Sequence, residues 1–242
     1  MWKGIIPYAL DHHVGTVQGV AAVEDAPRHF LARRPAISKH AANVALEGFR
    51  VKRAAAFGGA TCVSYVAPRS PHPYNETSFA CGAGARLADD KVVQASIELP
   101  ATIFQAAGAS AAAAAGGQSF KVQFIVYRNA KLFPLTNTSQ HAADKLVTTS
   151  VISSRIVDLD EVTTTLEQPV TVQLRMPLYT ENATAVYWNS SANGGYGDWE
   201  TDGCEITGQD GNLSIIHCTH LTDFAILQCI EVWFMRKGFN RD

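Results

Sequence analysis

Apolar and polar residues alternate in short runs along most of this chain after residue 42. Val170, Val172 and Leu174 alternate with polar neighbours, and residues 122–127 follow a two-residue period before a turn at 129–130 and a return through 132–133. A period of two is typical of a half-buried β-strand. Further segments that we predict as strands are 43–51, 61–66, 91–99, 147–157, 184–188, 213–218 and 222–228. Many short strands separated by turn residues predict a mainly β fold, an antiparallel β-sandwich.

The first part of the chain has a different spacing. Residues 13–31 show the weak three-to-four-residue period of a helix, carried by Val14, Val17, Val20, Val23, Phe30 and Leu31. We therefore expect a short N-terminal helix ahead of the sandwich. A chain of 242 residues with 47% hydrophobic residues is long enough for one large β domain or two small ones.

Charge and hydropathy exclude several classes of function. The formal net charge of −2 and a pI near 6.4 argue against a nucleic-acid partner and against binding to an anionic membrane. No run approaches the ~18 consecutive apolar residues of a membrane span, so we expect no transmembrane helix in this sequence. Residues 1–10 contain one charge, a very short apolar run and a proline, which is not the pattern of a signal peptide.

Asn-x-Ser/Thr sequons nevertheless suggest a glycosylated surface. The candidate glycosylation sites are Asn75, Asn137, Asn182, Asn189 and Asn212. Glycosylation belongs to the secretory pathway, whereas the sequence shows no targeting signal. We expect the chain to be a fragment of a longer extracellular protein, or the product of a truncated gene model.

The tripeptide His220-Leu221-Thr222 carries the chemistry that a chain needs to cut itself. The Thr222 hydroxyl can attack the carbonyl of Leu221, and the cyclic intermediate opens to an ester that water hydrolyses. A hydroxyl is a weak nucleophile until a base takes its proton, and His220, with an unperturbed pKa of about 6.5, is the obvious base. A planar amide resists such attack, so the bond must also be strained or exposed. A bare tripeptide of this kind is usually an ordinary turn before a strand, so its context decides.

The residues before this tripeptide form a longer motif. Trp188 comes first, then the block Trp199-x-x-x-Gly203-Cys204, and then Cys218-x-His220-Leu221-Thr222. This order resembles the GPS motif that closes the GAIN domain of adhesion G-protein-coupled receptors, with Trp188, Trp199 and Gly203 in its core.

Segments further upstream extend the likeness. The segments 42–47, 61–62, 93–100 and 126–133 look like the A subfamily of these receptors, so the resemblance covers roughly residues 17–229. It implies three parts. Residues 1–38 would be a helical remnant of GAIN subdomain A, residues 39–229 would be subdomain B with its GPS motif at 184–228, and residues 230–242 would be a truncated juxtamembrane tail.

The resemblance also implies a disulfide. Ala185 and Ile216 stand where the family has its first and third GPS cysteines. Both members of one family disulfide are therefore missing, which implies that the remaining Cys204 and Cys218 are bonded to each other.

Other cysteines are expected to form a second bridge. Cys62 and Cys81 bracket a proline-rich loop, and Cys229 is left over. Two bridges and one odd cysteine fit an oxidising compartment. The alternative is a set of five reduced, buried thiols.

In the family that the chain resembles, cleavage occurs between residues corresponding to Leu221 and Thr222, and the following segment, 222–228, acts as a tethered agonist. The residues implied as agonist contacts are Thr222, Phe224, Ile226 and Leu227. Strand alternation places Phe224 and Ile226 on one face and Leu227 on the other, so we expect a strand buried on both faces. Gln228 stands where the family usually has Met.

The implied partner is the seven-helix transmembrane domain of the same receptor, which lies outside this sequence, together with an unidentified extracellular ligand or co-receptor. The implied location is the extracellular side of the plasma membrane. We expect single-turnover self-cleavage and no turnover enzyme, because the chain shows no Ser-His-Asp spacing and no open-site ligand set. We expect no cofactor and no metal, since a bridged Cys218 leaves only His217 and His220 close by. The alternative function is a non-cleaving structural or adhesion module of the same fold.

Overall fold

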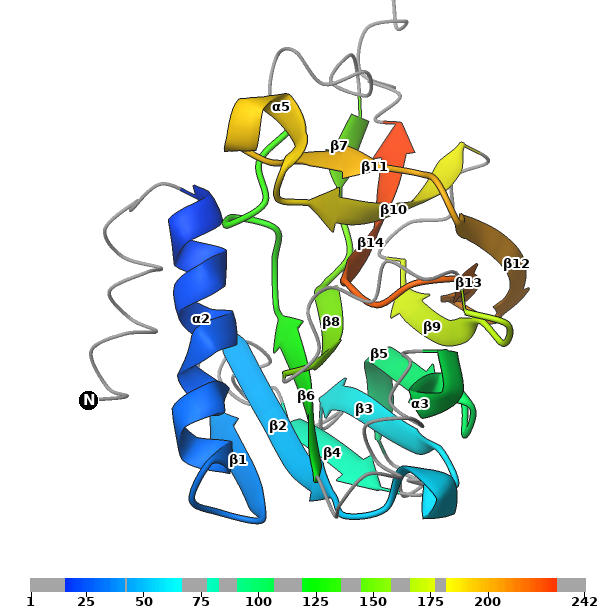
Figure 1. The fold of residues 1–242 in the computed structure, drawn as a ribbon. Coiled ribbons are helices and arrows are strands. Elements are labelled where there is room, and N and C mark those ends of the chain that lie inside the picture. Colours follow the sequence, from blue (N-terminus) through cyan, green and yellow to red (C-terminus); the bar gives the residue numbers. More distant parts are fainter. Residues whose placement is uncertain are drawn as a thin grey trace, which may run out of the picture.

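The structure is a computed structural model and describes residues 16–41, 43–66, 78–82, 91–106, 119–135, 145–157, 166–176 and 182–229. Within these ranges the strands form two antiparallel sheets, as the alternating pattern predicted (Figure 1). The larger sheet has the order β1 (Ala36–His40), β2 (Val44–Val51), β6 (Phe120–Tyr127), β8 (Val151–Ile156), β14 (Asp223–Cys229), β10 (Ala183–Asn189) and β11 (Asp198–Glu200), with β7 (Lys145–Val147) also paired to β14. The smaller sheet has the order β12 (Cys204–Asp210), β13 (Leu213–Cys218), β9 (Val170–Arg175), β5 (Val92–Leu99), β3 (Ala60–Val66) and β4 (Ser78–Gly82).

The long helix α2 (Thr16–Leu31) stands along the outer face of the larger sheet, beside β1, β2 and β6 (Figure 1). Val20, Val23 and Leu31 are buried there, which confirms the helical spacing seen in the sequence. Arg50 closes the end of this helix, because its guanidinium donates hydrogen bonds to the carbonyls of Leu31, the last helical residue, and of Ala32 directly after it. The short helical elements η1 (Ala54–Ala56), α3 (Ile103–Ala106) and α5 (Ala192–Gly195) lie in connections. Among the helices of the described ranges, none has the length and apolar character needed to cross a membrane.

Two hydrophobic clusters explain why some strands are apolar at nearly every position. One cluster fills the space between the sheets, where Phe124 of β6 faces strands such as β9 with Val172. The other lies between α2 and the outer face of the larger sheet, where Ile125 of β6 is fully buried. A sheet covered on both faces needs apolar residues at odd and even positions. The period of two is therefore clearest in β9, which has one buried face.

Each segment predicted as a strand contains one, except the return through 132–133, and two further details differ. The segment 147–157 holds the end of β7 and the whole of β8, separated by residues 148–150. The return through Leu132 and Phe133 is wrong as a strand, because these residues form a turn in which Phe133 N–H donates to the Ala130 carbonyl. Strands β1, β4, β7, β11 and β12 were not predicted. β12 is mostly exposed at a sheet edge and β1 buries only Ile37, so neither carries a repeated apolar pattern.

The proposed division of the chain at residue 38 falls inside β1. It stays a prediction, as does the tail at 230–242, which lies outside the described residues.

Candidate functional site

Strand β14 lies inside the larger sheet and is covered on both of its faces. It pairs with β8 on one side, where Asp223 is opposite Ser153, and with β10 on the other. Phe224 and Ile226 point into the cluster between the sheets, whereas Ala225 and Leu227 belong to the cluster under α2. These four side chains are fully buried, which confirms the prediction of a strand apolar on both faces.

The predicted cleavage bond lies in the short crossing between the two sheets. β13 of the smaller sheet ends at Cys218 and β14 of the larger sheet begins at Asp223, so residues 219–222 connect the layers. Backbone hydrogen bonds hold this crossing. Thr219 N–H donates to the Gly203 carbonyl at 2.9 Å, and the Thr222 carbonyl accepts from Ser154 N–H at 3.2 Å. The crossing is thus tied to both layers immediately before and after the Leu221–Thr222 bond.

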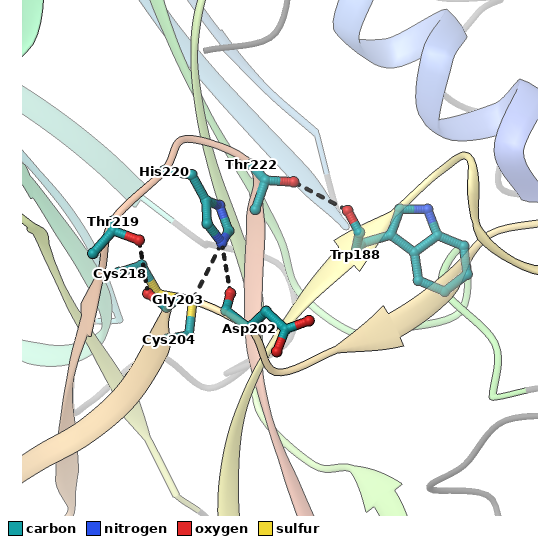
Figure 2. Close-up of a disulfide and its surroundings, with 8 residues drawn as sticks. All are labelled: Trp188, Asp202, Gly203, Cys204, Cys218, Thr219, His220 and Thr222. Carbon is teal, nitrogen blue, oxygen red and sulfur yellow. Dashed lines mark hydrogen bonds between the residues drawn. A yellow bond between two sulfur atoms is a disulfide. The ribbon is translucent and has the colours of Figure 1, made fainter. Parts of the chain in front are cut away.

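The His220 ring is directed toward the turn before β12. Its Nε2 lies 3.1 Å from the Asp202 carbonyl oxygen and 3.9 Å from Cys204 Sγ (Figure 2). A carbonyl oxygen can only accept, so Nε2 carries the proton and the basic lone pair is on Nδ1. The ring also packs against Tyr187, with centroids 4.3 Å apart, and against Phe224.

Burial lowers the pKa of His220 below its ordinary value, and the hydrogen bond to the Asp202 carbonyl opposes this only in part. The imidazole is therefore neutral at physiological pH. A neutral ring is the form that can accept a proton from a hydroxyl.

Thr222 points away from His220. Its hydroxyl is half-buried and donates a hydrogen bond of 3.0 Å to the Trp188 carbonyl on β10 (Figure 2). A base at His220 predicts that its ring lies within hydrogen-bond reach of the Thr222 hydroxyl, directly or through one water. In this structure the two groups are not bonded directly to each other. The reason is that each group already bonds to a backbone carbonyl, and the two carbonyls lie on different sides of the crossing. The contact through one water stays a prediction.

Gly203 makes room for the histidine. Its φ is +75°, a conformation that favours glycine. A Cβ built at this position would lie 2.6 Å from Thr219 Oγ1 and 3.2 Å from His220 Cδ2. Cys204 follows directly and is bonded to Cys218, with which it is in register across β12 and β13. The glycine and the disulfide together place the Asp202 carbonyl under the His220 ring.

Comparison with known proteins identifies this arrangement. The GPS family model, described as GAIN subdomain B, matches residues 51–231, which is more than half of the chain. The chain belongs to this family. A search of curated proteins finds adhesion G protein-coupled receptor A3 of Danio rerio, 32% identical over 85% of this chain, and its counterpart in Mus musculus, 32% identical over 78%. The chain spans only 16% of the length of each of these relatives.

A solved structure has the same fold. The "Full extracellular region of zebrafish Gpr126/Adgrg6" aligns with a TM-score of 0.65 over 85% of this chain and 25% of that one. At 18% identity this likeness concerns the fold alone. Together with the family match it shows that the β-sandwich is the fold of a GAIN-containing extracellular region.

The GPS tryptophans of this GAIN subdomain B form its aromatic core. The Trp188 and Trp199 rings meet edge to face with centroids 5.4 Å apart, and both contact Phe133. Trp199 Nε1 donates to the Phe133 carbonyl at 3.1 Å. A Cβ at Gly197, where φ is +80°, would overlap the Trp188 ring. The packing of the tryptophan rings thus fixes the position of β10, as expected for large buried rings. The Trp188 carbonyl on this strand is the acceptor of the hydrogen bond from the Thr222 hydroxyl.

Both expected disulfides of the GAIN subdomain B are present in the structure. The second joins Cys62 and Cys81, which are opposite each other on β3 and β4. Ala185 and Ile216, which the resemblance to the GPS motif sets at two cysteine positions of the family, are buried between the sheets. The side chain of the remaining Cys229 is not among those described.

The three sequons that fall on described residues lie at turns and at a strand end. Asn182 and Asn212 are exposed. Asn189 is half-buried, and its side chain donates to Glu200 Oε2 and accepts from Ser191 N–H. Asn75 and Asn137 lie outside the described residues. Glycosylation at the five positions stays a prediction.

Sequence reasoning missed the partners that position the site. The Asp202 carbonyl left no signal, because any residue has such a carbonyl. A group of charges at the start of β14, formed by Glu24, Arg155 and Asp223, was also missed. Its one available signal was an acidic residue, Asp223, at the head of an otherwise apolar strand.

Proposed function

We propose that this GAIN subdomain B cleaves its own chain once, between Leu221 and Thr222. The observation that supports this best is the state of His220. Its Nε2–H is bonded to the Asp202 carbonyl, its burial keeps the ring neutral, and its basic Nδ1 is left for a proton from the neighbouring hydroxyl. The intact tripeptide lies at the crossing between the sheets, where the backbone is held on both sides.

The reaction needs one side-chain rotation. Thr222 must turn about χ1 from the Trp188 carbonyl toward the carbonyl carbon of Leu221, giving up a hydrogen bond worth about 1 kcal/mol. The hydroxyl oxygen then bonds to that carbon while His220 takes the proton. The C–N bond breaks, His220 returns the proton to the Thr222 nitrogen, and an ester remains. Water hydrolyses the ester, which leaves a Leu221 carboxylate and an amino group on Thr222.

The two pieces stay together after the cut, because β14 keeps its ladder on both sides and its four buried side chains. Burying Phe224, Ile226 and Leu227 contributes about 1.5–3 kcal/mol each. The relatives are named adhesion G protein-coupled receptors, so we further propose that segment 222–228 is an agonist for the seven-helix domain of the same receptor. The domain would then be on the extracellular side of the plasma membrane, with an extracellular ligand or co-receptor still to be identified.

The second candidate is a module of the same fold that does not cleave. It is favoured by the resting geometry, in which the Thr222 hydroxyl is bonded to Trp188 and His220 faces the opposite side of the crossing. Such a module would serve as a structural or adhesion unit.

Secretory expression of the chain followed by a denaturing gel separates the two functions. Self-cleavage predicts two pieces, the smaller with Thr222 as its N-terminus. Thr222→Ala should give one piece with the fold intact, Thr222→Ser should retain some cleavage, and Thr219→Ala, which removes a nearby hydroxyl, should still cleave. If the unmodified chain is correctly folded and glycosylated but gives a single uncut piece, the domain is a structural or adhesion unit that does not cleave.

A further inference from the structure

A group of charges, made of two buried carboxyls and one partly exposed guanidinium, joins helix α2 to the first residue of β14. Asp223 is fully buried, and the Glu24 side chain is only 9% exposed. Nη2 of Arg155, on β8, lies 2.7 Å from Glu24 Oε1 and 3.4 Å from Asp223 Oδ2. Three elements from distant parts of the sequence therefore meet one residue after the predicted cleavage bond.

The charges of this group do not balance if both carboxyls are ionised. Two carboxylates and one guanidinium leave an excess negative charge in a site from which Asp223 has no access to water, and such a charge is costly to bury. Asp25, next along α2, adds to the negative potential. Among the side chains that the structure describes, the other groups that face the pair are the hydroxyls of Tyr127 on β6 and Ser153 on β8, neither of which supplies a positive charge.

One proton removes the imbalance. Burial raises the pKa of Glu24 well above its usual range, and the charge of Asp223 raises it further, with Arg155 opposing. Burial also raises the pKa of Asp223, but Arg155 and hydrogen bonds from Ser153 and Glu24 work against the rise. The proton therefore belongs on Glu24, and the Asp223 carboxylate stays ionised beside the Arg155 guanidinium.

We propose that a proton shared by two carboxyls attaches α2 to the start of β14. Glu24, Arg155 and Asp223 are the positioning residues of this attachment, and they hold the Leu221–Thr222 bond in the crossing. The backbone of β8 supports the same point, because Ser154 N–H donates to the Thr222 carbonyl and Ser153 is in register with Asp223. The role in holding the bond rests on the proposed cleavage. The attachment of α2 to β14 does not.

The sign of the pH dependence follows from the proton. A carboxyl with a raised pKa in the folded state contributes stability that is fully present below its unfolded pKa of about 4.3 and is lost as pH rises toward the folded pKa. The attachment should therefore be strongest in mild acid and weaken toward neutral and basic pH. Glu24→Gln has a neutral amide that can donate to Asp223 and that does not titrate, so it should preserve the attachment at all these pH values.

Urea unfolding of the full chain between pH 5 and 8, followed by tryptophan fluorescence, tests this. All variants carry Thr222→Ala, so each is a single uncut chain. Relative to Glu24→Gln, the folding equilibrium constant with native Glu24 should fall by up to tenfold per pH unit across the titration range. Asp25→Asn removes the adjacent, exposed carboxylate of the same helix. Its curve should keep the pH slope of native Glu24 and move slightly to lower pH, because Asp25 is the smallest contribution to the raised pKa of Glu24. The folding equilibrium constant of Glu24→Ala should be lower than that of Glu24→Gln at every pH.

Parallel curves for native Glu24 and Glu24→Gln would overturn the shared proton, as would a loss of stability in Glu24→Gln equal to that in Glu24→Ala. A second measurement restores Thr222 and compares cleavage rates. Glu24→Ala should slow the cut, whereas Asp25→Asn should not. If no variant is cut, the proposed function fails, and the pH dependence of the folding equilibrium still tests the attachment of α2 to β14. If cleavage is normal but the pH dependence is the same for native Glu24 and Glu24→Gln, only the attachment is wrong.

Discussion

Replacing Gly203 by alanine should displace His220 and slow any cleavage at Leu221–Thr222. The substitution has two separable effects. An L-residue at φ +75° costs about 1–2 kcal/mol, and the new Cβ would lie 2.6 Å from Thr219 Oγ1 and 3.2 Å from His220 Cδ2. Overpacking of this kind typically costs about 1–3 kcal/mol. We therefore expect Gly203→Ala to lower the free energy of unfolding by roughly 2–5 kcal/mol in total.

Gly211 provides a matched control. It has φ +56° at the turn between β12 and β13, and no atom lies within 4 Å of a Cβ built there. Gly211→Ala should thus show the backbone cost of about 1–2 kcal/mol without the collision. Urea unfolding gives both free energies, and the rate at which the two pieces appear on a denaturing gel gives the effect on cleavage.

A double variant identifies the atoms responsible. Thr219→Ala removes the nearer contact, so Gly203→Ala combined with Thr219→Ala should recover part of the lost stability, and the two effects should not add. The His220 contact remains, so cleavage should recover less than stability does. Equal losses in Gly203→Ala and Gly211→Ala, both with normal cleavage, would contradict the collision with Thr219 and His220, because the glycine would then be needed only for its backbone conformation.

Three further predictions concern the chemistry of the cut and the retention of β14. His220→Ala should slow cleavage by roughly 10²- to 10⁴-fold. In the unmodified chain cleavage should fade only as pH falls through the lowered pKa of His220, at a lower pH than a free imidazole would give, and a rate–pH profile with its midpoint above 6.5 would contradict this. Phe224→Ala should lower the free energy of unfolding by about 3–5 kcal/mol and release the piece that begins at Thr222 after cleavage. Tyr196→Ala is the control, because this side chain is 74% exposed. It should leave the free energy of urea unfolding unchanged, and the two pieces should still co-purify.

Much of the sandwich could be predicted because strand periodicity is a local property of the sequence. Residues 170–174 alternate in the sequence and in their burial, and the apolar run at 224–227 indicated a strand covered on both faces. Strand β12 could not be predicted in this way. It is an exposed edge strand held by its ladder to β13, and a ladder made of backbone groups leaves no pattern in the side chains.

The GPS cysteines and tryptophans were also readable in the sequence, because their identities and order are specific. The bonds of the candidate site were not. Residues 202, 188 and 220–222 belong to different strands and turns, and only the crossing between the sheets decides that His220 bonds to the Asp202 carbonyl and Thr222 to the Trp188 carbonyl. A carbonyl is the same in every residue, so its use as a partner is invisible until the chain is folded.

The pairing of Glu24 with Asp223 was beyond sequence reasoning for a related reason. Along the chain, Glu24 is one charge on an amphipathic helix and Asp223 is an acid at the head of a strand, and either would be expected in water. Packing α2 onto the larger sheet buries both beside Arg155, and burial is what gives them a shared proton. Local residue patterns were enough to predict the strands, the family motif and the reactive tripeptide. Which groups lose their water, and what they bond to instead, follows from how the helix and the two sheets pack together.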